Sequence, residues 1–152
     1  MVCGDGNAMH QFLHVDDAAL CFAHVLGKPH CIGQVYNMVK MGFTSWSEYH
    51  RAVMRILGQE VDMVVVPLEV IKAAQVPQSS ICENIFAHNT VYSPGKLYRD
   101  VPEFRPRISL EEGIQRVLAA LDRQCRIPDS DSIEWEDRLI RAHRDFIRAC
   151  AP

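Results

Sequence analysis

The sequence predicts an α/β fold because a strand-like run, a helical pattern and a second strand-like run follow one another near the start. Residues 12–15 (Phe-Leu-His-Val) are mostly apolar and lead into Asp16 and Asp17, either of which is expected to begin a helix. Apolar residues then recur at helical spacing until Gly27 supplies a stop signal. Residues 34–38 again have the composition of a strand. This order is typical of a layer with parallel strands.

A second helix is marked at both ends. Ser45 and Glu48 form a capping box, and Gly58 provides a stop. The run 61–66 is apolar and rich in valine, which predicts a buried strand. Pro67 suits the first position of the helix that follows.

The middle of the chain contains weaker signals. The helix after residue 67 is expected to end near Pro77, and residues 78–90 fit a short helix and irregular structure equally well. Ser93 followed by Pro94 predicts a short helical turn that continues to Tyr98.

The last part of the chain is expected to contain two helices joined by a linker. Ser109 and Glu112 form a capping box at the start of the first. The polar segment 128–132 predicts the linker. Residues 135–149 carry an apolar stripe beside several arginines, which we interpret as a solvated face, because acidic neighbours accompany them.

Composition argues against several classes of function. The 152 residues are 48% hydrophobic and carry a formal charge of −3, so no strong field attracts nucleic acid or anionic lipid. The sequence contains neither a signal-peptide pattern nor an apolar run of membrane-spanning length. We therefore expect a cytoplasmic protein with no nucleic-acid or membrane partner.

Six cysteines are scattered without a CxxC pair, and we expect them to be reduced thiols. Four histidines and three cysteines fall within residues 3–31, but their spacing does not match the usual tetrahedral zinc sites. No metal ligands are therefore predicted.

Several motifs together resemble the extended short-chain dehydrogenase/reductases, the NAD-dependent epimerase/dehydratase family. They occur in the family's order and cover most of the chain: Gln-Phe-Leu-His-Val-Asp-Asp-Ala at 11–18, Gly33 to Asn37, Ser45 to Gly58, Val65-Val66-Pro67, and the segments 95–102 and 104–114.

The resemblance implies a fold and a division into parts. Residues 1–41 would be the last strand-helix-strand of a Rossmann-like half, here a partial sheet edge. Residues 42–124 would form a small mixed α/β substrate-binding domain, and residues 125–152 a linker and C-terminal helix. The chain is then expected to be the C-terminal, substrate-binding part of an oxidoreductase or isomerase that uses NAD or NADP on a sugar-like or other hydroxyl or carbonyl compound.

The cofactor and catalytic groups of this family are not expected in the chain. Gly4-x-Gly6 lacks the third glycine of a dinucleotide site and is interpreted as a turn. The family's catalytic Tyr-x3-Lys pair needs a helix, where the two side chains lie about 6 Å apart. Tyr36-x3-Lys40 falls at a predicted strand end, and Tyr92-x3-Lys96 is interrupted by Pro-Gly, so neither pair is assigned a catalytic role.

Four residues remain as substrate-binding candidates. In nucleotide-sugar members of the family, arginine often stands where this chain has His10, beside Gln11. A neutral imidazole is a weaker phosphate partner than a guanidinium, so a nucleotide-sugar substrate is put in doubt. Tyr92 and Lys96 lie near the loop that approaches the ligand in the family, although a packed tyrosine and a surface lysine are equally consistent with the sequence.

Two further functions stay open. The chain could be a stand-alone, non-catalytic binding or regulatory module that kept the ligand cleft, or one half of an enzyme assembled in trans. In the favoured interpretation its partner is a Rossmann half, in cis or in trans, and the chain alone is inactive and binds no cofactor tightly. Self-association through an exposed sheet edge is a further expectation.

Overall fold

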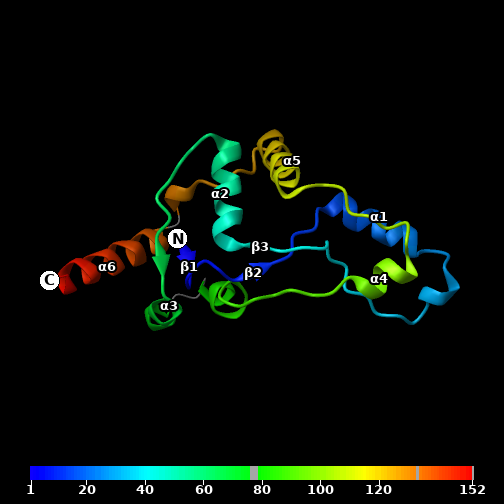
Figure 1. The fold of residues 1–152 in the computed structure, drawn as a ribbon. Coiled ribbons are helices and arrows are strands. Elements are labelled where there is room, and N and C mark those ends of the chain that lie inside the picture. Colours follow the sequence, from blue (N-terminus) through cyan, green and yellow to red (C-terminus); the bar gives the residue numbers. More distant parts are fainter. Residues whose placement is uncertain (76–78, 133, 152) are drawn as a thin grey trace.

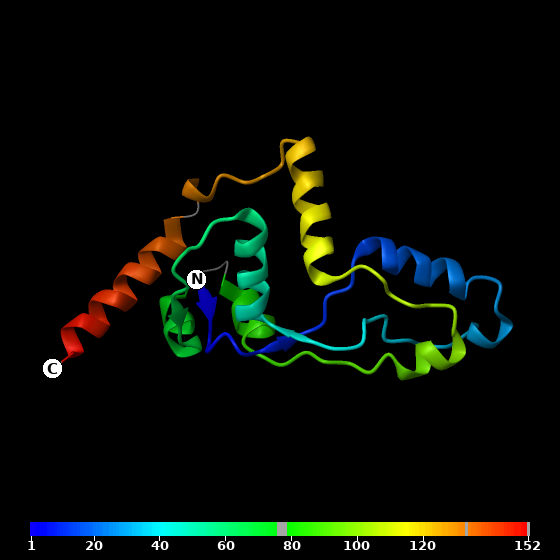
Figure 2. The ribbon, with the colours of Figure 1, turned by 45° about the horizontal axis from the view of Figure 1, so that its top comes forward.

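The computed structural model describes residues 1–75, 79–132 and 134–151. Figures 1 and 2 show an elongated molecule in which extended segments join two lobes. The first lobe contains β1 (Val2–Cys3), α2 (Trp46–Leu57), β4 (Val65–Val66), α3 (Leu68–Ala74), the π-helix η3 (Cys82–Phe86) and α6 (Glu134–Cys150), with α5 (Leu110–Arg123) beside α2. The second contains α1 (Val15–Val25), η1 (Pro29–Cys31) and α4 (Gly95–Asp100). The predicted mixed α/β class is confirmed.

The strands are short and form two separate pairs. β1 pairs in parallel with β4, with Val2 opposite Val65, whereas β2 (Met9–His10) pairs antiparallel with β3 (Thr44–Ser45). The strand predicted at 61–66 is therefore reduced to its last two residues. The ladder is limited because β1 itself is short and the chain turns away at Gly4, whose φ is +66°.

Two predicted strands are wrong. Residues 12–14 and 34–38 belong to no strand in the described part of the chain. An apolar run becomes a strand only where another backbone lies alongside and forms hydrogen bonds with it. These two runs contact the rest of the described chain through side chains instead. The Tyr36 hydroxyl, for example, donates to Asp100 at 3.0 Å. The predicted parallel arrangement around α1 is wrong for the same reason, because the parallel pair joins β1 to β4.

The start of α1 also differs from the expectation. His14 is the N-cap residue, and its Nδ1 accepts a hydrogen bond from the backbone N–H of Asp16 at 3.1 Å. Asp16 and Asp17 lie in the first turn, where carboxylates still favour the helix dipole. Asp17 is not free to cap α1 because it binds backbone groups elsewhere.

The serine N-caps of the two predicted capping boxes are confirmed, whereas the carboxylates of Glu48 and Glu112 accept hydrogen bonds from Arg55 and Arg116. The hydroxyl of Ser45 accepts from the N–H of Glu48 at 3.2 Å, and α2 ends at Gly58 with a φ of +63°. At the start of α5, the hydroxyl of Ser109 accepts from the N–H of Glu112 at 3.1 Å.

The remaining helices follow the predictions with small shifts. Pro67 precedes α3 as its N-cap, one position earlier than predicted, and α3 ends at Ala74 with Gln75 as its C-cap. Pro77 and Gln78 lie outside the described residues. The ambiguous segment after them contains η3, and Ser93 caps the turn into α4 by accepting from Gly95 at 3.2 Å.

The predicted linker and final helix are present. Exposed backbone with a short 3₁₀ turn, η4 (Ser130–Ser132), leads into α6. Leu139 on α6 is buried, whereas Phe146 and Ile147 are 67% and 52% exposed. Figure 2 shows the C-terminal end of α6 projecting away from the first lobe. Within the described residues, no helix combines the length and hydrophobicity that crossing a membrane requires.

Each lobe has its own hydrophobic cluster. The first is built on Cys3, Val66, Ile71, Cys82 and Leu139. The second is built on Cys21, Cys31, Leu97, Val101 and Phe104. The second cluster therefore combines residues from both sides of the predicted domain boundary at 41/42. The division of the chain into the three predicted parts remains a prediction.

Candidate functional site

A junction of extended segments between the lobes brings distant parts of the sequence together at Gln11. The Nε2 of Gln11 donates to the carbonyl of Lys40 at 2.9 Å, and its Oε1 accepts from the N–H of Tyr92 at 2.6 Å. The preceding residue, His10, is bridged to Thr90. One carboxamide thus ties together three segments that carry the chain from one lobe to the other.

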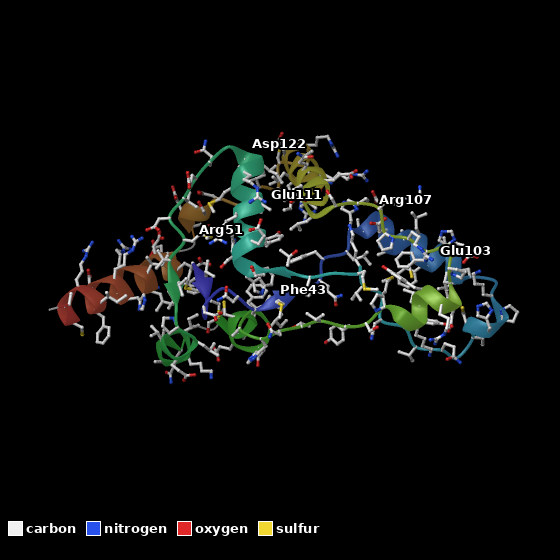
Figure 3. All side chains as sticks on the ribbon, in the orientation of Figure 1. Phe43, Arg51, Glu103, Arg107, Glu111 and Asp122 are labelled. Atoms are coloured by element: carbon white, nitrogen blue, oxygen red, sulfur yellow. The ribbon has the colours of Figure 1, made fainter. Side chains whose placement is uncertain are left out.

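A crevice of about 170 Å³ opens beside this junction. The residues that give it polar or aromatic character are His10, Gln11, Phe12, Lys40, Phe43 and Thr44. Figure 3 shows Phe43 on the connection between the lobes. The sequence predicted His10 and Gln11, but it gave no sign that Lys40, Phe43 and Thr44 would join them, because tertiary pairing of β2 with β3 brings that segment alongside.

His10 is the most constrained polar residue of the crevice. It is 6% exposed, and its ring centroid lies 4.5 Å from that of Trp46. Burial lowers its pKa below the ordinary 6.5, against a smaller opposing effect of the Phe86 backbone. Its Nε2 has no hydrogen-bond partner among the described residues. The imidazole is therefore neutral at pH 7, and its Nε2 is a buried polar atom without a partner among the described residues.

Lys40 is held in a fixed position, because its ammonium donates to the carbonyl of Ile108 at 2.7 Å. This neutral partner leaves the positive charge of Lys40 intact. With His10 neutral, Lys40 is the single cation among the residues that line the crevice, so a diphosphate would be only partly neutralised there.

The other two predicted site residues lie apart from the crevice lining. The Tyr92 side chain is 53% exposed, and only its backbone N–H reaches Gln11. The Lys96 ammonium donates to Gln34 Oε1 at 2.8 Å and to the Val35 carbonyl at 3.2 Å. The structure therefore brings His10, Gln11 and the Tyr92 backbone together and places Lys96 with α4 in the second lobe. A role in substrate binding for all four remains a prediction.

Comparison with known proteins finds similarity in sequence and in fold, and no protein-family model matches the chain. The sequence is 26% identical over 131 residues to 2'-dehydrokanamycin reductase of Streptomyces kanamyceticus, a match that covers 86% of this chain and 37% of that protein. The fold is similar to that of UDP-glucuronic acid 4-epimerase from Bacillus cereus, solved with UDP-glucuronic acid and NAD. The TM-score is 0.61 at 17% identity, over 81% of this chain and 35% of the epimerase.

These matches confirm the resemblance to the extended short-chain dehydrogenase/reductases. The chain spans about a third of the length of each matched protein. The matched epimerase was solved with NAD, which supports NAD as the cofactor of this group of proteins.

The environment of Tyr36 is unsuited to the catalytic tyrosine of an extended short-chain dehydrogenase/reductase. Its pKa is raised by the hydrogen bond to the Cys31 thiol, by burial and by the Asp100 carboxylate, whereas a catalytic phenol needs a lowered pKa. Lys40 binds Ile108 instead of lying beside Tyr36. The Lys96 ammonium lies 5.0 Å from the centroid of the Tyr36 ring and forms a cation–π interaction with it.

The glycines at the start of the chain form a turn, as predicted. Gly4 and Gly6 have φ values of +66° and +71°, and the N–H of Gly6 donates to the carbonyl of Cys3 at 3.3 Å. The space beside Gly6 is filled, because an added Cβ would lie 2.2 Å from the Ser47 hydroxyl. Gly6 is thus needed for close packing on α2.

The described part of the chain contains no cluster of side chains that could bind a metal ion. Within residues 1–75, 79–132 and 134–151, no three histidine, cysteine or acidic side chains are placed to hold one ion. All six cysteines are free thiols, with Cys125 and Cys150 exposed.

Proposed function

We propose that this chain forms the substrate-binding part of an NAD(P)-dependent epimerase, dehydratase or reductase, and that a dinucleotide-binding Rossmann half completes the enzyme in cis or in trans. The observation that carries the proposal is the crevice at the Gln11 junction, where His10, Gln11 and Lys40 gather from two distant segments. The chain's match to about a third of each relative is consistent with a contribution of one part.

The proposed substrate is sugar-like, with hydroxyl or carbonyl groups. One relative is named for the reduction of 2'-dehydrokanamycin, and the matched epimerase was solved with UDP-glucuronic acid. The neutral His10 and the engaged Lys40 favour a substrate that presents uncharged polar groups to the crevice. A diphosphate would be only partly neutralised there, by Lys40.

In this proposal the chain's own residues bind and orient the substrate. His10 Nε2, which is buried and unpartnered among the described residues, would hydrogen-bond a hydroxyl or carbonyl after a movement of the side chains that cover it. Gln11 would fix the crevice walls through its two backbone contacts. The nicotinamide cofactor supplies hydride transfer when bound by the other half. Positioning of the substrate against it is the contribution expected from the crevice.

The test is a set of binding measurements on the chain by two-dimensional ¹H–¹⁵N NMR and calorimetry. Titration with 2'-dehydrokanamycin should shift amides of residues 10–12 and 40–44, and UDP-glucuronic acid, which carries a diphosphate, should give weaker shifts at the same residues. NAD should bind no tighter than millimolar. Micromolar NAD binding would contradict the division of roles.

Variants locate the site. His10→Leu removes the hydrogen-bonding nitrogen and should weaken sugar binding by about tenfold, the equivalent of one lost hydrogen bond in a buried position. Lys72→Met on the surface of α3 is the control and should bind as the parent chain does. A panel of sugars that gives no shift at residues 10–12, with or without a co-expressed Rossmann partner, would refute a substrate-binding role.

A further inference from the structure

A second cavity, of about 320 Å³, lies between α2 and α5, separate from the crevice at Gln11. One wall is the apolar face of α5, formed by Leu110, Ile114, Val117, Leu118 and Leu121. Figure 2 shows α2 and α5 next to each other, and Arg51 and Glu111 mark the two helices in Figure 3.

The opposite walls are held in place by specific contacts. The Phe12 ring stacks on Tyr49 of α2 with a centroid distance of 4.7 Å and an interplanar angle of 12°. Arg55 of α2 lies 3.8 Å from the Glu111 carboxylate of α5. Both helices begin at capping boxes, so the cavity is bounded by defined elements and not by a loose loop.

Two side chains with polar rings line this mostly apolar space. His14 is one of them, and its Nδ1 accepts a hydrogen bond from Asp16 N. In the neutral ring the proton is therefore on Nε2, which becomes a donor. Tyr49 is the other, and its hydroxyl is also a donor. The lining thus includes two donor groups among apolar side chains.

The size and lining define a class of ligand. At about 30 Å³ for each water-sized volume, the cavity has room for about ten non-hydrogen atoms. Apolar walls hold water poorly, whereas ligand cavities of this size are lined by hydrophobic side chains with a few oriented polar groups. The ligand must carry a hydrogen-bond acceptor if it is to bind the donor groups of His14 and Tyr49.

We propose that the cavity between α2 and α5 binds a compact, uncharged aromatic or alicyclic molecule that carries one carbonyl or ether oxygen. This ligand is bound by the chain itself and independently of the crevice. Phe12 and Leu110 line both spaces, so a bound molecule also steadies one wall of the crevice.

The experiment compares acetophenone with ethylbenzene, which has nearly the same shape but no acceptor. Each is titrated into the ¹⁵N-labelled chain. Acetophenone should give saturable shifts at Val53, Gly113 and Val117 and should bind about tenfold more tightly than ethylbenzene, as one hydrogen bond predicts. Equal affinities, or no saturable shifts up to the solubility limit of the ketone, would overturn the proposal.

Three variants distinguish binding in the cavity from nonspecific hydrophobic binding to the surface. Val117→Trp, at a half-exposed position on the wall, should fill the space and abolish binding, whereas Ile147→Trp on α6 adds the same side chain elsewhere and should not. Tyr49→Phe keeps the packing with Phe12 and should weaken only the ketone, by several-fold. Unchanged ketone binding in both Val117→Trp and Tyr49→Phe would exclude this cavity, whatever the result for the sugar crevice.

Discussion

Asp17 is predicted to be one of the largest single contributors to the stability of the second lobe. Its side chain is 2% exposed, and its two oxygens accept hydrogen bonds from the backbone N–H groups of Arg107 and Ile108 at 3.0–3.1 Å. These contacts tie the first turn of α1 to the segment that leads into α5. Backbone N–H groups removed from solvent need an acceptor, and the Asp17 carboxylate is the acceptor of both of these part-buried groups.

The cost of losing this carboxylate follows from the two N–H groups it satisfies. Asp17→Ala leaves both without an acceptor, at about 1–3 kcal/mol each, so we expect a loss of about 4 kcal/mol in the free energy of unfolding. Asp17→Asn keeps one carbonyl oxygen but turns an NH₂ group toward backbone donors, and we expect about 2 kcal/mol.

The matched control is Asp16→Asn. Asp16 occupies the same first turn of α1, so its replacement removes a similar favourable interaction with the helix dipole. Its side chain is 60% exposed and pairs with Arg116, an interaction that solvent screens. We therefore expect a loss of no more than about 1 kcal/mol.

Urea unfolding monitored by circular dichroism measures these differences, provided that the slope of the transition is unchanged. The expected order of midpoints is parent chain, Asp16→Asn, Asp17→Asn and Asp17→Ala, from highest to lowest. If Asp17→Ala is as stable as Asp16→Asn, the hydrogen bonds to Arg107 and Ile108 do not stabilise the fold as argued.

Three further outcomes can be measured by the same method. Gly6→Ala should destabilise by about 2 kcal/mol, and Gly4→Ala by only about 1 kcal/mol, because both have positive φ but only the added Cβ at Gly6 meets Ser47; equal losses would rule out the steric explanation. Ser45→Ala should cost about 1 kcal/mol through the lost cap, and no loss would show that α2 does not need it. Burial lowers the pKa values of His10 and His50, so the folded chain binds fewer protons than the unfolded chain as the pH falls below 6.5, and the urea midpoint should fall with it. Replacing both histidines with glutamine should flatten that dependence.

The sequence predicted helix ends well because the signals are local. Ser45 and Ser109 each bind an N–H three residues later, and Gly58 adopts the left-handed conformation that favours glycine. Each of these interactions is complete within one turn of chain. No information about the rest of the fold is needed to infer them.

The strands and the start of α1 could not be predicted in the same way. Whether residues 34–38 form a strand depends on a neighbouring backbone, and a side chain in this run instead binds Asp100, far away in the sequence. Similarly, Asp17 looks like a local cap, but its acceptors are used by Arg107 and Ile108. When a side chain could accept either a local or a distant hydrogen bond, the tertiary structure decides between them. Here the part-buried N–H groups have less access to water, so they require the protein acceptor.

The candidate site shows the same division between local and distant information. His10 and Gln11 were identified through the family motif, but the contacts that define their roles come from Lys40 and Tyr92, which the fold brings from elsewhere. Gln11 is the decisive case. Both ends of its carboxamide already bind backbone, so a substrate could engage Gln11 only by displacing one of these bonds. His10 Nε2 has no hydrogen bond to displace in the described chain, but a ligand reaches this buried atom only when the side chains around it move. Of the two adjacent residues, His10 is therefore the better candidate for direct ligand contact, and Gln11 for holding the segments that surround it.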